Sequence, residues 1–286
     1  MTPATWISIY LELGKARLSS LVLITTLAGY LAARGASLDW VHMIVTPAGP
    51  ALAAVGANGL NQVIERDRDA LMERTRERPL PSGRMGVTHA AVASLVTALV
   101  GCAVLWVWVG QLPALLAAGT VALYAGVYTP MKPRSNLNTM VGAVVGAIPP
   151  VIGWSAVTGG VETGGWLLGL LLFVWQIPHF LSLAWLYRED YRRGGYKMVS
   201  VEDPDGDATF RLMMIYAWLL LPLGLVMAYA GMAGSIFAAG SVLLGAAWLW
   251  QGVRCYRNRT QVNTRRVFLG SVMYLPLLLI LLVALP

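Results

Sequence analysis

Nine apolar runs close to the bilayer-crossing length of about 17 to 25 residues determine what this chain can fold into. Backbone groups inside lipid must be hydrogen-bonded within their own segment, which favours helices. Composition agrees, since 57% of the residues are hydrophobic and only 12% are charged. The sequence therefore predicts an all-α, polytopic membrane bundle of about nine transmembrane helices in one domain, 1–286. The spans are expected near residues 18–33, 43–63, 88–109, 111–129, 138–157, 165–186, 210–230, 233–252 and 268–285.

Two local features refine this picture. The third and fourth runs are separated by little more than Gly110 and Gln111, which predicts a tight antiparallel hairpin. No small-residue cleavage site follows the first run, so we expect this span to be retained rather than removed as a signal peptide.

The charged residues are distributed unequally between the two sides of the predicted bundle. Every lysine and arginine except Arg34 falls in loops on one side, which places the N-terminus and the long polar loops in the cytoplasm, with the chain in the cell inner membrane. The net charge of +7 is therefore attributed to topology and not to nucleic-acid binding. Only Asp39 and Glu162 among the acids lie on the other side. Topology hardly constrains acids, so their gathering predicts a polar site of mixed charge on the cytoplasmic face.

The most polar segment runs from residue 61 to 84 and contains two Asp, three Glu and six Arg. Asn61, Glu65 and Asp69 are spaced four apart, so a helix that continues past the second apolar run presents them on one face. Oxygen ligands of this kind suit Mg²⁺. Asp67 is a further candidate ligand, although such a helix turns it elsewhere. The alternative interpretation is a helix end with solvated ion pairs at the membrane surface.

A second polar cluster, YREDYRRGGYKM at 187–198, follows the sixth span on the same side of the membrane. It lies about four spans after the first cluster. This repetition predicts a duplicated bundle with halves at roughly 1–137 and 138–286 and a central site between them.

Several motifs resemble those of one family. The pattern N-x-x-x-[DE]-x-x-x-D followed by MERTRERPLPSGR, together with YTPMKPRSNLNT at 128–139, GAIPPVIGW at 146–154 and WQIPHFLSLAWLYREDY at 175–191, is similar to the UbiA-type intramembrane prenyltransferases and their haem-directed subgroup. The resemblance implies a helical bundle around a central cavity and two acidic motifs with Mg²⁺ as the cofactor. It also implies that Asn61, Glu65 and Asp69 carry the first Mg²⁺ site.

The same resemblance implies a reaction and its partners. A farnesyl group would pass from farnesyl diphosphate to a vinyl group of haem b with addition of water, giving haem O, and a haem A synthase is a further expected partner. Membrane lipid surrounds the protein. A quinone, chlorophyll or lipid acceptor remains the alternative within the family. A secondary transporter remains the alternative outside it, although transporters usually place their charges near the bilayer midplane.

Arginine and lysine side chains in the motif loops are the candidates for diphosphate binding, since arginine offers bidentate contacts to phosphate. Arg74 and Arg78 lie in the first motif and Lys132 in the loop after the fourth span. For each of them the alternative is a topological role or a lipid headgroup contact.

The second motif departs from the family's usual pattern. Many members have D-x-x-x-D there, and this chain has Arg188, Glu189, Asp190 and Tyr191. Asp190 is the candidate catalytic and metal-binding carboxylate, with Arg188 and Lys197 as candidate phosphate contacts.

His179 lies inside the sixth span, where an ionisable residue is a candidate for function. Imidazole can ligate haem iron, so His179 is the candidate haem-binding residue. The alternative is a neutral histidine that hydrogen-bonds to a neighbouring helix.

Overall fold

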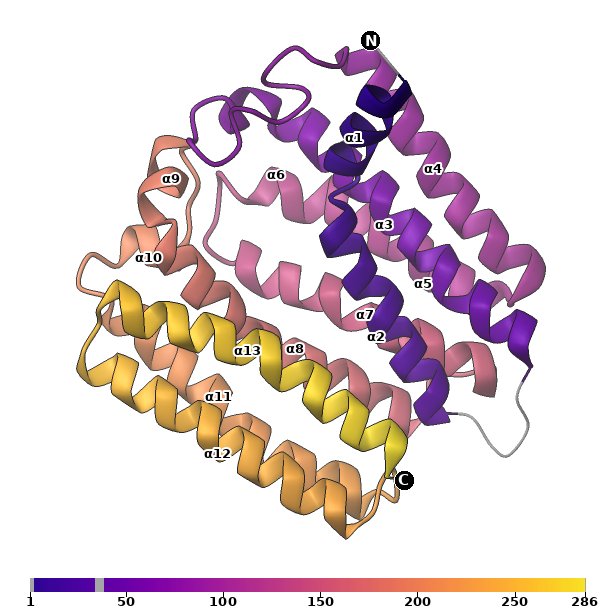
Figure 1. Ribbon diagram of the computed structural model, residues 1–286, viewed down its shortest axis with the longest axis vertical. Helices are drawn as coiled ribbons and strands as arrows, with labels where there is room; N and C mark the ends of the chain where they lie inside the picture. Colours follow the sequence, from indigo (N-terminus) through magenta and orange to yellow (C-terminus); the bar gives the residue numbers. More distant parts are fainter. Residues whose placement is uncertain (1–2, 34–38, 286) are drawn as a thin grey trace.

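The computed structural model describes residues 3–33 and 39–285, and Figure 1 shows their arrangement as a bundle of helices. In these two ranges nine helical segments are long and apolar enough to cross a membrane, which confirms the predicted fold class. They are α2 (Ala16–Ala33), α3 (Trp40–Asp69), α4 (Val87–Trp108), the run α5–η1–α6 (Gln111–Ala122, Leu123–Tyr128 and Thr129–Met131), α7 (Asn138–Thr158), α8 (Thr163–Leu186), α11 (Asp207–Tyr229), α12 (Ser235–Arg257) and α13 (Gln261–Ala284).

Several helices extend past the apolar runs that predicted them. α3 continues to Asp69, α12 continues to Arg257, and α13 begins at Gln261. Three short helices were not predicted, because each is too short to cross a bilayer; they are α1 (Pro3–Leu13), α9 (Arg188–Arg193) and α10 (Val199–Glu202).

The helices form two groups joined through α2, α7 and α8. α3 packs on α4 and α2, α2 packs on α7, and α8 packs on α7, α11 and α13 (Figure 1). Gly29 of α2 and Gly153 of α7 allow α2 and α7 to touch. A Cβ on Gly29 would collide with the Pro150 carbonyl, and one on Gly153 with the Thr26 carbonyl. Small residues of this kind let membrane helices approach backbone to backbone.

The loops that the charge pattern assigns to one side do lie together. The Lys197 backbone N–H donates to the Lys132 carbonyl oxygen at 2.8 Å, and the Arg259 guanidinium lies 2.5 Å from Asp207. At the other end, Asp39 caps α3 by accepting from the His42 N–H at 3.0 Å. Arg34, the one cation predicted for that side, lies outside the described residues. The compartment that each end faces and the division into repeated halves stay predictions.

The predicted hairpin between the third and fourth spans is present. α4 ends at Trp108 and α5 begins at Gln111, with Gly110 at a φ of 149°. Glycine adopts this backbone conformation without strain, so the chain can reverse within two residues.

Candidate active site

The polar face of α3, formed by Asn61, Glu65 and Asp69, points into the protein at the loop end of the bundle. The three residues are 0%, 5% and 1% exposed. Their spacing of four places them on one face of the helix, as the sequence predicted. The α3 polar face therefore brings two carboxylates and an amide together in a buried environment.

Each of these three side chains is matched with a cation. Lys132 Nζ lies 2.8 Å from Glu65 Oε1, Arg78 Nη1 lies 2.7 Å from Asp69 Oδ2, and Lys15 Nζ donates to Asn61 Oδ1 at 2.6 Å. Lys15, Arg78 and Lys132, here called the cation trio, come from three different segments of the chain. Buried charges require such partners, because an isolated buried ion is strongly destabilising.

A hydrogen-bond chain fixes the orientation of the Asn61 amide. The Thr129 hydroxyl donates to the Tyr124 carbonyl at 2.8 Å, so it accepts from Asn61 Nδ2 at 3.0 Å. Asn61 Oδ1 is therefore turned toward Lys15, on the side of the cations. The sequence predicted Asn61 as an oxygen ligand, and this orientation makes its oxygen available for that role.

Lys15 is a site residue that the sequence analysis missed. It lies in the turn between α1 and α2 at a φ of 48°. Gly14, the residue before it, packs closely against Val55, because a Cβ added to Gly14 would lie 2.7 Å from Val55 Cγ1. Burial, and then the neighbouring Arg78 and Lys132 cations, lower the pKa of Lys15 to about 7. In the sequence it counted only as one of many cations near a span, and nothing local distinguished it.

Lys132 is held by its neighbours as a charged group. Burial alone would lower the pKa of Lys132, but the Tyr128 phenol and the Glu65 carboxylate raise it well above its ordinary value. Lys132 Nζ also lies 4.7 Å from the centre of the Tyr128 ring. Lys132 Nζ lies 5.7 Å from the centre of the Tyr196 ring. Tyr196 is 3% exposed, and burial raises the pKa of its phenol.

The second motif meets the first through the loop after α3. Asp190 is 8% exposed, accepts from the Glu73 backbone N–H at 3.1 Å, and lies 2.6 Å from Arg193, which also pairs with Glu73 at 2.6 Å. Arg68 donates to the Gly194 carbonyl at 2.8 Å. The contacts of Asp190 and Arg193 with Glu73, here called the seam, thus hold the two motif loops together.

Four predicted residues do not join the α3 polar face. Asp67 has a side chain that is 85% exposed and pairs with Arg66. Arg74 lies over the Tyr187 and Tyr191 rings, at 5.1 Å and 5.9 Å from their centres. Arg188 lies over the Trp185 ring at 4.4 Å. Lys197 has an exposed side chain.

Lys197 nevertheless contributes to the site through its backbone. Its N–H donates to the Lys132 carbonyl at 2.8 Å, and its own carbonyl accepts from Asn138 Nδ2 at 2.7 Å. These bonds hold the loop after the fourth span in place, and with it Lys132.

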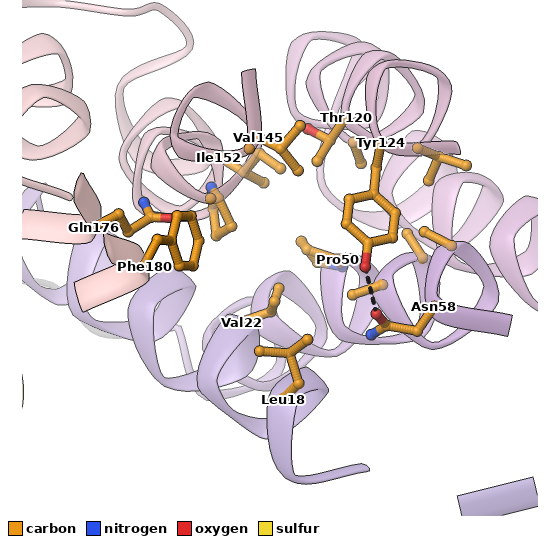
Figure 2. A pocket seen from close by; sticks show the side chains of 18 residues that line it. Leu18, Val22, Pro50, Asn58, Thr120, Tyr124, Val145, Ile152, Gln176 and Phe180 are labelled. Carbon is orange, nitrogen blue, oxygen red and sulfur yellow. Dashed lines mark hydrogen bonds between the residues drawn. The ribbon is translucent and has the colours of Figure 1, made fainter. Parts of the chain in front are cut away.

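Figure 2 shows an apolar chamber enclosed by several helices. Along α3 this chamber begins about one helical turn from the polar face. α2, α3, α5, η1, α7 and α8 contribute to its lining, which includes Asn58, three residues before Asn61 on α3. Tyr124 donates to Asn58 Oδ1 at 3.2 Å, and these two side chains are among the few polar groups in the lining. The π-helical turn η1 positions Tyr124 and Tyr128, whose rings stack at 5.3 Å. Such turns occur frequently at functional sites.

His179 does not line this chamber, although Gln176 and Phe180 on the same helix do. Its ring stacks between Trp175, at 4.9 Å, and Phe268, at 5.0 Å, and its Nδ1 lies 2.7 Å from Ser271 Oγ. The histidine is thus held at the interface of α8 and α13 by a neighbouring helix. The structure does not bring the predicted haem-binding residue to the candidate site.

The donor set fits a Mg²⁺ ion that shares its coordination with a ligand. Within residues 3–33 and 39–285 no three His, Cys, Asp or Glu side chains gather as a metal cluster. The α3 polar face instead offers two carboxylates and one amide oxygen. Mg²⁺ usually takes one or two protein carboxylates and completes its octahedron with water and phosphate oxygens. The cations beside the face suit a phosphate for that purpose.

The chain is similar to known proteins over most of its length. A model of the UbiA prenyltransferase family matches residues 22–278. The protoheme IX farnesyltransferase of Solibacter usitatus is 42% identical over 278 residues, covering 94% of this chain and 95% of that protein.

Two solved structures share the fold. One is digeranylgeranylglyceryl phosphate synthase, with a TM-score of 0.80, 13% identity and coverage of 97% of both chains. The other is a UbiA homologue from Archaeoglobus fulgidus bound to GPP and Mg²⁺, with a TM-score of 0.67, 15% identity and coverage of 97% of this chain and 100% of that one. Since the family model and a relative of similar length both match nearly all of it, this multi-pass membrane chain belongs to the UbiA prenyltransferase family.

Proposed function

We propose that the chain transfers the farnesyl group of farnesyl diphosphate to a vinyl group of haem b with addition of water, giving haem O and diphosphate. The C–O bond of the allylic diphosphate breaks, and a C–C bond forms between the farnesyl C1 and the outer vinyl carbon. The oxygen of water adds to the inner vinyl carbon and releases a proton. The protoheme IX farnesyltransferase of Solibacter usitatus, 42% identical to this chain, supports this choice of donor and acceptor.

One observation carries the proposal. The α3 polar face and the cation trio meet within one helical turn of the apolar chamber, because Asn58 of the chamber and Asn61 of the face are neighbours on α3. A prenyl diphosphate has the same polarity, with a highly charged head on an apolar chain. The site therefore matches this substrate class in both its parts.

The cation trio stabilises charge on the leaving group. Lys15, Arg78 and Lys132 lie beside the α3 polar face, so they would contact a diphosphate bound there. Negative charge on the diphosphate oxygens grows as the C–O bond breaks. Asn61, Glu65 and Asp69 would hold Mg²⁺, which neutralises the diphosphate when it is bound. Asp190 is proposed as the carboxylate contributed by the second motif, on its side of the seam with Glu73.

The chamber protects the reacting carbon. Its walls are mostly apolar, so they exclude water from the cationic farnesyl carbon. Tyr124 lines the chamber and its ring stacks with that of Tyr128, and aromatic faces stabilise a nearby cation. Tyr124 and Asn58 offer the hydroxyl and amide that can orient a single water molecule there.

Product analysis tests the proposal. Purified protein would be incubated with haem b, farnesyl diphosphate and Mg²⁺, with an EDTA control, and the extracted haems analysed by liquid chromatography and mass spectrometry. A metal-dependent product heavier than haem b by a farnesyl group plus a hydroxyl group is expected. Prenylation of a quinone precursor with no haem product, by protein shown to be folded, would overturn the acceptor.

Location and partners complete the proposal. The site lies at the end of the bundle to which the sequence assigns all the cations except Arg34. By the positive-inside rule this end would face the cytoplasm, with the chain in the cell inner membrane. Haem O is the expected substrate of a haem A synthase, which is the protein partner we propose.

A further inference from the structure

A groove of about 680 Å³ runs along the surface between α12 and α13 and shares no lining residue with the chamber. The two helices lie side by side in Figure 1. The groove follows α12 from Leu244 to Arg254 and α13 from Arg266 to Leu277. It is therefore on the order of 15 Å long, at a rise of about 1.5 Å per residue.

The groove is cationic at one end and apolar at the other. Arg254 and Arg266 lie at the end nearest the connection between α12 and α13, where Arg259 pairs with Asp207 at the start of α11. Leu244 and Leu277 line the opposite end. This gradient along the helices matches an amphiphile with an anionic head at the membrane surface and a hydrocarbon chain directed into the bilayer.

Two guanidinium groups and one phenol hydroxyl of the groove have no polar partner within residues 3–33 and 39–285. The side chains of Arg254 and Arg266 are exposed and make no hydrogen bond or ion pair there, in contrast to that of Arg259. Tyr274 is 3% exposed, and its hydroxyl has no hydrogen-bond partner in the same ranges. A buried hydroxyl of this kind is costly unless something bonds to it.

Gly270 keeps the middle of the groove open. A Cβ at this position would lie 2.9 Å from Gln251 Oε1 and 3.0 Å from Trp248 Cδ1, so a larger residue would displace the side chains of the groove. Trp248 is fixed there, because its indole N–H donates to the Val267 carbonyl at 3.0 Å.

We infer that this groove binds one anionic phospholipid, separately from the prenyl-transfer site. Its headgroup phosphate lies between Arg254 and Arg266, where guanidinium groups give bidentate contacts. One acyl chain lies along the apolar track past Ala247 toward Leu244 and Leu277. A zwitterionic lipid is held less well, since its own cation opposes the two arginines.

Native mass spectrometry of the full chain, released from nanodiscs of equal parts phosphatidylglycerol and phosphatidylcholine, tests this inference. The wild type is expected to retain one phosphatidylglycerol. Arg254→Gln/Arg266→Gln should weaken its retention at least tenfold, since both charge-assisted contacts to the headgroup phosphate are lost. Arg257→Gln/Arg265→Gln is the matched control, since it removes two exposed cations of the same connection that do not line the groove.

A second variant tests the acyl-chain track without changing charge. Ala247 is exposed and lines the groove, so Ala247→Phe should fill the track and reduce lipid retention about tenfold, while melting temperature and prenyl transfer stay unchanged. Equal loss of phosphatidylglycerol in the Arg257/Arg265 control would show diffuse surface charge and overturn the proposal. Unaltered retention in Ala247→Phe, or displacement of the bound lipid by haem b, would also overturn it.

Discussion

Lys132 Nζ lies 2.8 Å from Glu65 Oε1 and 3.2 Å from Glu65 Oε2, so one lysine spans both oxygens of a carboxylate that is only 5% exposed. Removing either residue should destabilise the folded protein, because the charge of the other residue is then buried without a partner. The pair therefore links the stability of the site to its chemistry, and the two effects need to be separated by experiment.

Glu65→Gln should reduce prenyl transfer about 100-fold or more and raise the Mg²⁺ concentration needed for half-maximal activity, because a metal-binding carboxylate is lost. It should also lower the melting temperature. Glu65→Gln/Lys132→Met removes both buried charges and should recover most of the melting temperature without recovering activity. Recovery of activity in the double variant would contradict the metal-binding role.

Asp67→Asn is the matched control for the metal site. Asp67 comes from the same helix, but its side chain is 85% exposed and pairs with Arg66. Exposed pairs of this kind contribute about 0 to 1 kcal/mol. Mg²⁺ titration of Asp67→Asn should therefore superimpose on that of the wild type; a shift as large as that of Glu65→Gln would return Asp67 to the ligand set.

Lys15→Met should lower kcat/KM for farnesyl diphosphate about 10- to 100-fold, since one donor aimed at developing charge is typically worth this much or more. Arg17→Gln changes an exposed cation two residues away and should leave kcat/KM within about twofold. Steady-state kinetics on both variants, with melting temperatures as the folding check, separates a contact with substrate from a general effect of charge. Equal losses in both variants would contradict the role of Lys15.

The pH profile should reveal the same lysine. Its pKa is lowered to about 7 by burial and by Arg78 and Lys132, so Lys15 is protonated below pH 7 and loses its charge as the pH rises. kcat/KM, which reports on the free enzyme, should fall between about pH 7 and 9 toward the value of Lys15→Met. Lys15→Arg stays protonated throughout and should lack this fall. Parallel profiles for wild type and Lys15→Arg would assign the fall to another group.

Arg193→Ala should loosen the seam between the two motif loops. Arg193 pairs with both Glu73 and Asp190, whereas its neighbour Arg192 pairs with Glu189 within the same short helix. Hydrogen exchange in the 70–86 loop should increase and kcat/KM fall about threefold to tenfold in Arg193→Ala. Arg192→Ala should change neither, and equal exchange in the two variants would show that the seam does not depend on Arg193.

Local spacing predicted the spans and the α3 polar face, because both follow from helical periodicity alone. The spacing of Asn61, Glu65 and Asp69 was enough to place them on one side of α3. The position of Lys15 was not predictable in this way. It depends on a break between α1 and α2, which in turn depends on Gly14 packing against Val55 from another helix.

Residue type was a weaker guide to the site than helical spacing. Lys197 was expected to contact phosphate through its ammonium group, but its backbone holds Lys132 while its side chain is exposed. His179 was expected near haem, but its ring fills the space between Trp175 and Phe268. In both cases the sequence named the residue, whereas only the packing of distant segments determines which of its atoms faces the site.

Gly146 gives a test of the chamber itself. A Cβ at this position on α7 would collide with the Gln176 amide, and both residues line the chamber. Gly146→Val should therefore narrow the chamber and lower kcat/KM for farnesyl diphosphate at least tenfold, with a smaller loss for the shorter geranyl diphosphate. Gly119→Ala on α5 is the matched control, since nothing lies within 4 Å of its added Cβ. Competition between farnesyl and geranyl diphosphate measures the ratio of their kcat/KM values directly. An unchanged ratio in Gly146→Val would place the prenyl chain outside the chamber.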